Sequence, residues 1–132
     1  MSQRLLLDAG ALIGLSRGDG QVRAVLEAAL LRGYAVVVPT PVVTQVHRGS
    51  RHQARTDRAL GEVDAFLPTG LRTARHAGEL LARTGMSDAV DAIVAAEALG
   101  GDPVMVLTSD AHDLTRLVEA GPGSRLVEVV GI

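Results

Sequence analysis

The chain has 132 residues and no cysteine, which suits a single domain without disulfide bonds or a thiolate-held zinc ion. It contains no lysine, which excludes P-loop enzymes, and its net charge of −2 excludes a general nucleic-acid coating protein. Tyr34 and Phe66 are the only aromatic residues, so contact with RNA cannot depend on stacked bases. Met1 to Arg4 have no signal-peptide or membrane-span pattern, and we expect a cytoplasmic protein.

In the first half of the chain, short apolar runs alternate with longer stretches of helical spacing. In chain order we predict a strand at residues 4–7, a short helix after Asp8, a helix at 21–32, a strand at 35–38 and a helix from Pro41 to Val46. Pro39 halts the second of these strands, and Pro41 suits the first turn of the helix that follows.

The same alternation continues through the second half. We predict helices at 52–64 and 71–84 with a short strand or loop around 66–68 between them, a helix from Ser87 to about Gly100, a strand ending at Leu107, a helix at 113–120 and a strand at 125–130. Apolar strands without alternation, separated by helices, are typical of a parallel sheet covered on both faces. We therefore expect one α/β domain over residues 1–132, with a central parallel sheet of four to five strands flanked by helices.

Four aspartates lie where predicted strands end and helices begin. Asp8 follows the first strand, Asp110 follows the strand that ends near Leu107, and Asp88 and Asp91 open a helix. In open α/β sheets, ligands bind beyond the carboxyl ends of the strands. Carboxylates gathered at that edge repel one another, and a cation relieves the repulsion. The sequence therefore predicts a divalent metal site.

These acids also have a structural interpretation. Aspartate often caps a helix or complements its dipole in the first turn, and Asp8, Asp88 and Asp113 are all placed to do so. Asp88 and Asp91 are three residues apart, as are Asp110 and Asp113, so each pair would share a helix face. Both interpretations remain open from the sequence alone.

Three motifs resemble the PIN domain family, and more narrowly the VapC-type toxin ribonucleases of toxin–antitoxin pairs. They are Leu7 to Ile13, Val90 to Ala96 and Leu107 to Leu114, and the resemblance spans the whole chain. It implies a PIN-like fold in which Asp8, Asp91 and Asp110 are the catalytic ligands of Mg²⁺ or Mn²⁺. Further candidates for the same site are Asp88, Asp113, Gln45 and Ser109.

The resemblance also implies the activity and the partners. A VapC-type toxin is a metal-dependent endoribonuclease that hydrolyses RNA phosphodiesters, and a structured RNA such as tRNA is the expected substrate. A small cognate antitoxin is expected to cover the acidic groove. We expect a homodimer and no association with a membrane.

Gln45 departs from the family pattern, which has a glutamate on the helix after the second strand. An amide carries no charge, and Mg²⁺ prefers carboxylate and water oxygens. Asp88 could restore the missing charge, or the metal could bind more weakly. Alternatively, the domain could have lost catalysis and serve as an RNA- or protein-binding module.

The segment from His47 to Arg58 is the most basic of the chain. Arg48, Arg51 and Arg55 could contact RNA phosphates beside the acidic edge, because arginine pairs bidentately with phosphate. The alternative is an ordinary solvated helix face.

Overall fold

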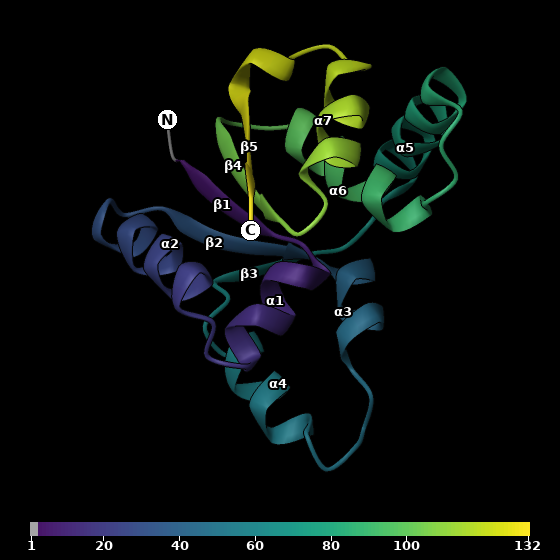
Figure 1. The fold of residues 1–132 in the computed structure, drawn as a ribbon. Helices are drawn as coiled ribbons and strands as arrows, with labels where there is room; N and C mark the ends of the chain where they lie inside the picture. Colours follow the sequence, from purple (N-terminus) through teal and green to yellow (C-terminus); the bar gives the residue numbers. More distant parts are fainter. Residues whose placement is uncertain (1–2) are drawn as a thin grey trace.

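A five-stranded sheet in which every neighbouring pair of strands is parallel forms the centre of the computed structural model, which describes residues 3–132 (Figure 1). The strand order is β3-β2-β1-β4-β5. The strands are β1 (Arg4–Leu7), β2 (Ala35–Pro39), β3 (Ala65–Leu67), β4 (Val104–Thr108) and β5 (Val127–Gly131). The predicted parallel sheet of four to five strands is confirmed.

Helices cover both faces of this sheet. They are α1 (Ala9–Ser16), α2 (Gly20–Leu31), α3 (Thr40–Val46), α4 (Gln53–Leu60), α5 (Leu71–Thr84), α6 (Ala89–Leu99) and α7 (Ala111–Glu119). In Figure 1, α1, α2 and α4 lie on one side of the sheet, whereas α5, α6 and α7 pack together on the other. Helix α3 contacts both α1 and α6.

The centre of the sheet is buried on both faces, and the residues of its central strand show this most clearly. Leu5, Leu6 and Leu7 of β1 are each 0% exposed, and Val36 and Val38 of the neighbouring β2 are as well. A strand covered by helices on both sides needs apolar residues at successive positions, not at alternate ones. The apolar runs therefore specify the centre of the sheet, and the polar residues that end them lie at its edge.

The boundaries of several elements differ from the predicted ones, among them those of α4, β5 and α7. Helix α4 ends at Leu60, not at residue 64, because Gly61 closes it and the chain turns into β3. Strand β5 begins at Val127, after a short 3₁₀ turn at Ser124–Leu126 that starts from Gly123 in the left-handed region. Helix α7 begins at Ala111, two residues before the predicted start, with Asp110 as its N-cap.

The predicted domain runs over residues 1–132, of which Met1 and Ser2 lie outside the described residues. Within residues 3–132, every helix is too short or too polar to cross a membrane.

Candidate functional site

The carboxyl ends of β1 and β4 lie side by side at the centre of the sheet. Leu7 pairs with Leu107, and the Asp8 backbone N–H donates to the Leu107 carbonyl at 3.2 Å. Asp8 therefore lies beside the segment from Thr108 to Asp110 although they are far apart in sequence. The first turn of α6, which carries Asp91, faces the same edge.

Asp8 is buried and held in one orientation. Its side chain is 5% exposed, and its two carboxylate oxygens accept hydrogen bonds from the Ala11 N–H at 2.9 Å and the Thr108 hydroxyl at 2.5 Å. Burial raises the pKa of Asp8, and the hydrogen bonds from Thr108 and the backbone oppose that rise. Asp8 thus caps α1, as the structural interpretation holds, and also lines a cavity at the carboxyl edge of the sheet.

Thr108 connects Asp8 to Asp110. Its side chain is 0% exposed, and its hydroxyl donates to Asp8 while accepting from the Asp110 backbone N–H at 2.8 Å. A single buried hydroxyl therefore fixes the position of one acid and the backbone of another.

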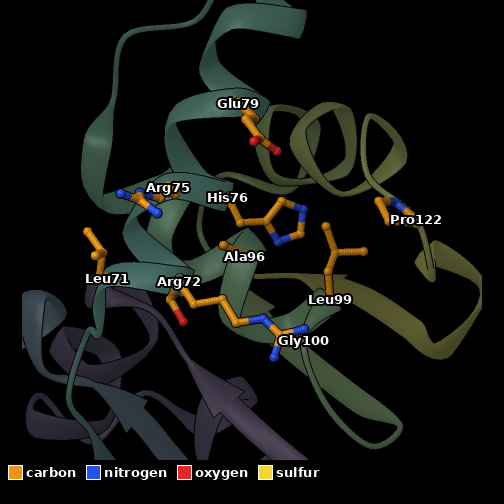
Figure 2. A pocket seen from close by; sticks show the side chains of 10 residues that line it. Leu71, Arg72, Arg75, His76, Glu79, Ala96, Leu99, Gly100 and Pro122 are labelled. Carbon is orange, nitrogen blue, oxygen red and sulfur yellow. The ribbon is translucent and has the colours of Figure 1, made fainter.

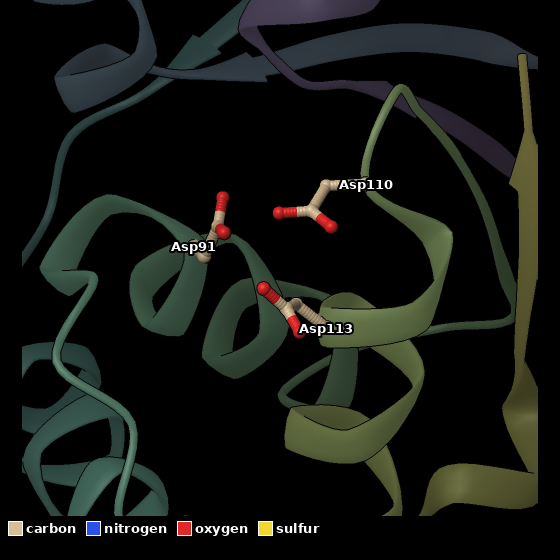
Figure 3. A group of neighbouring side chains, drawn as sticks. All are labelled: Asp91, Asp110 and Asp113. Carbon is tan, nitrogen blue, oxygen red and sulfur yellow. The ribbon is translucent and has the colours of Figure 1, made fainter.

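Asp91, Asp110 and Asp113 form a cluster in which one carboxylate oxygen from each lies within 4.8 Å of the others (Figure 3). Burial, followed by the charges of Asp88, Asp110, Asp8 and Asp113, raises the pKa of Asp91 to about 7. The site therefore favours a bound proton or cation over an additional free negative charge.

The donor set of this cluster fits a hard divalent cation. Mg²⁺ takes oxygen ligands at about 2.0–2.1 Å, so ligands on opposite sides of the ion lie about 4.1 Å apart. One oxygen from each of the three carboxylates, all within 4.8 Å of one another, is therefore within reach of a single cation. Asp113, an additional candidate in the sequence, belongs to this group of three, whereas Asp8 lies outside it.

Most of the residues predicted for the metal site line a single cavity of about 180 Å³. Its lining comprises Asp8, Ala9, Gly10, Val42, Gln45, Asp88, Val90, Asp91, Val94, Ser109 and Asp110. Gln45 thus lies on the wall of the acidic cavity, at the position where the family resemblance expects a glutamate. Asp88 also lines it, while one of its oxygens caps α6 by accepting from the Asp91 N–H at 3.0 Å.

Gly10 lies against Ser109, whose side chain leaves no room for a larger residue at position 10. A Cβ atom built on Gly10 would lie 2.0 Å from the Ser109 Oγ and 2.5 Å from its Cβ. Both distances are far inside van der Waals contact, so a larger residue must move α1 or the chain after β4. Since Asp8 precedes Gly10 and Asp110 follows Ser109, that movement would disturb the acidic cavity.

We expect Gly10→Ala to destabilise the protein by about 1–3 kcal/mol, as overpacked sites do, although alanine is normally favourable in a helix. The matched control is Gly78→Ala in α5, where a Cβ meets nothing within 4 Å, and which we expect to be neutral or slightly stabilising. Urea unfolding measures both variants. Equal stabilisation by the two changes would show that Ser109 moves away freely.

The basic segment lies beside the acidic cavity. Arg48 and Arg55 line a second cavity of about 390 Å³ together with Arg17, and Gln45 lines both cavities. Arg51 is exposed on the same segment but is not part of that lining. The sequence did not single out Arg17, because only the packing of α1 against α4 brings it to this segment.

A family model described as PIN domain matches residues 5–119. Among solved structures, the chain is similar to one titled as the crystal structure of VapBC2 from Rickettsia felis bound to a DNA fragment from their promoter, with a TM-score of 0.74. That similarity covers 97% of this chain and 98% of the other at 14% identity, so it concerns the fold. No curated protein sequence matches significantly. Because the family model spans most of its length, the chain belongs to the PIN domain family.

Proposed function

We propose that the chain is a metal-dependent endoribonuclease and the toxin of a toxin–antitoxin pair. One observation carries this proposal: a PIN domain gathers Asp91, Asp110 and Asp113 within 4.8 Å at the functional edge of its sheet, next to the buried Asp8. The likeness to a VapBC2 structure supports the toxin–antitoxin part of the proposal.

Asp8, Asp91 and Asp110 are the proposed catalytic and metal-binding residues, with Mg²⁺ or Mn²⁺ as the cation. Asp113 is an additional proposed ligand because its oxygen lies in the same group. When bound, the divalent cation would neutralise charge on the scissile phosphate and lower the pKa of an attacking water. Asp8, held by Thr108, would keep its carboxylate fixed, and the exposed Ser109 could donate a hydrogen bond to a phosphate oxygen.

RNA is the proposed substrate because a basic cavity adjoins the acidic one. Arg17, Arg48 and Arg55 could hold the phosphate next to the scissile one, with Gln45 between the two cavities. Arg51 is exposed nearby and could contact the backbone further along. Recognition through phosphates suits a structured RNA such as tRNA, and it agrees with the lack of aromatic residues.

Two protein partners are part of the proposal. The first is a cognate antitoxin that covers the acidic cavity. The second is another copy of the chain, since Phe66 on the outer strand β3 is 41% exposed beside an apolar surface formed with Val43 and Leu60. An exposed apolar surface beside an unpaired sheet edge supports a dimer contact. A toxin of this kind would act on RNA in the cytoplasm.

A fluorogenic RNA cleavage assay tests the proposed activity. We expect cleavage in Mn²⁺ or Mg²⁺ and none in EDTA, because the carboxylates alone cannot neutralise a phosphate. Equal cleavage in EDTA would indicate a contaminating metal-independent ribonuclease.

One residue favours a second function. Gln45 lines the acidic cavity as a neutral amide, where the family pattern has a charged glutamate. In that case the domain is an RNA- or protein-binding module. It would then bind RNA through the basic cavity without cutting it in any divalent cation.

A further inference from the structure

A cavity of about 700 Å³ lies at the opposite end of α6 from the acidic cluster (Figure 2). Asp91 is in the first turn of α6, whereas Ala96, Leu99 and Gly100 at its end line this cavity. The rest of the lining comes from α5 and from the loop after α7, and comprises Leu71, Arg72, Thr73, Arg75, His76, Glu79 and Pro122. The cavity is therefore separate from both cavities of the proposed active site.

Basic side chains dominate the polar wall of this cavity. Arg72, Arg75 and His76 have the spacing of residues that share one face of a helix. In Figure 2 the Arg72 side chain extends towards Gly100, and the His76 ring lies beside Leu99. Within residues 3–132, the one ion pair is between Arg23 and Glu62, so neither arginine of the cavity has a carboxylate partner. Glu79 is the only acid in the lining.

These basic residues are unfavourable for α5 alone. Arg72 and Arg75, three residues apart, repel each other on the helix surface, and a positive charge near the first turn opposes the helix dipole. Glu79, four residues after Arg75, offsets part of this for Arg75 but not for Arg72. Helix α5 has Arg72 in its first turn, no acidic residue there and no side-chain cap. The stability of α5 therefore does not explain Arg72, whereas an anion beside the Arg72 guanidinium would give it a favourable partner.

The other wall of the cavity is apolar. Ala96 and Leu99 of α6 and Pro122 of the loop after α7 provide it, and the cavity volume is in the range of small-molecule sites, about 300–1,000 Å³. A ligand that fits both walls has an anionic group and a compact, less polar body. A purely inorganic anion would leave the apolar wall unused.

We infer that this cavity binds a small phosphate-bearing molecule of nucleotide size. Arg72 would hold the phosphate with the His76 ring beside it, and the body of the ligand would lie against Leu99 and Pro122. Arginine suits this role because its planar guanidinium pairs with two phosphate oxygens at once. Arg75 extends to the other side of α5, near Leu71 (Figure 2). The inference does not depend on the proposed nuclease activity, since none of these residues belongs to the acidic or the basic cavity beside it.

Titration calorimetry with AMP, adenosine and inorganic phosphate tests the inference. The titrations are done in EDTA, so that no cation can attach a phosphate to the acidic cluster. We expect AMP to bind more tightly than inorganic phosphate, and adenosine not to bind measurably. Arg72→Ala should weaken AMP binding by about tenfold or more, because it removes a charge-assisted hydrogen bond.

Arg32→Ala is the matched control, since it removes the same charge from an exposed position at the end of α2. It should leave AMP affinity unchanged, and thermal melting should show that both variants fold. The inference is wrong if AMP at millimolar concentration does not bind the parent. It is also wrong if Arg72→Ala and Arg32→Ala have equal effects, or if adenosine binds as well as AMP.

Discussion

Asp91→Asn is expected to abolish cation-dependent RNA cleavage and, at the same time, to stabilise the cation-free protein above pH 7. The two effects have one origin, the negative charge that Asp91 adds to a partly buried group of acids. Loss of cleavage by about 10²–10³-fold is typical when one preorganised electrostatic contact is removed from an active site. The increase in stability follows because a neutral amide is not repelled by its neighbours.

The direction of the pH dependence follows from the pKa of Asp91, which burial and the surrounding carboxylates raise from 3.8 to about 7. The folded protein therefore binds this proton more tightly than the unfolded chain does. The associated stability is complete below pH 3.8 and is lost as the pH rises towards 7. A shift of this size corresponds to about 4 kcal/mol, and we expect about 2 kcal/mol after screening by solvent and salt.

Thermal melting in EDTA at about pH 5 and pH 8 measures this effect, because Asp91 changes its charge between these values. The parent should lose stability between the two conditions, and Asp91→Asn should lose less. Adding Mn²⁺ should stabilise the parent and leave the variant almost unchanged. Glu128→Gln, at an exposed position on β5, is the control for removing one charge. If Asp91→Asn and Glu128→Gln melt alike at about pH 8, the acidic cluster does not carry the repulsion proposed for it.

The sheet and most of the site could be predicted because both depend on local patterns. A run such as Leu5, Leu6 and Leu7, in which polar residues do not alternate with apolar ones, specifies a strand buried on both faces. An aspartate at or just after the end of such a run lies at the carboxyl edge, which is why Asp8 and Asp110 were identified. The pairing of Leu7 with Leu107 then brings the two strand ends together.

Features that depend on packing between distant elements could not be predicted. The sequence does not reveal that Asp113, and not Asp8, shares the closest group with Asp91 and Asp110, because side-chain directions at the start of α7 decide it. Arg17 reaches the basic cavity only through the contact of α1 with α4. Capping and site formation were treated as alternatives for Asp8 and Asp88, yet both residues cap a helix and line the acidic cavity.

Gln45→Glu is expected to have opposite effects on stability with and without a divalent cation. Gln45 lines the acidic cavity with Asp8, Asp91 and Asp110, so a new carboxylate there adds repulsion in EDTA and attraction for a bound cation. A unit charge about 4 Å from a cation is worth on the order of 4 kcal/mol at an effective dielectric of 20, before desolvation and repulsion among the acids reduce it. About 1.4 kcal/mol of that gain suffices for tenfold tighter binding.

Melting in EDTA and in Mn²⁺, together with Mn²⁺ titration calorimetry, measures both effects. We expect a lower melting temperature in EDTA, a higher one in Mn²⁺ and about tenfold tighter Mn²⁺ binding. Gln21→Glu is the matched control, because it makes the same chemical change at an exposed position in the first turn of α2. It should not alter Mn²⁺ affinity.

The double variant Gln45→Glu with Asp88→Asn tests whether Asp88 replaces the missing glutamate. Both residues line the acidic cavity, so the double variant keeps its total charge while moving one carboxylate from the start of α6 to α3. If Asp88 already supplies that charge, the double variant should bind Mn²⁺ as the parent does.

Faster RNA cleavage by Gln45→Glu would support a nuclease weakened by its glutamine, whereas tighter Mn²⁺ binding without any cleavage would favour the binding module. Unaltered Mn²⁺ affinity in both variants would mean that Gln45 does not face the cation.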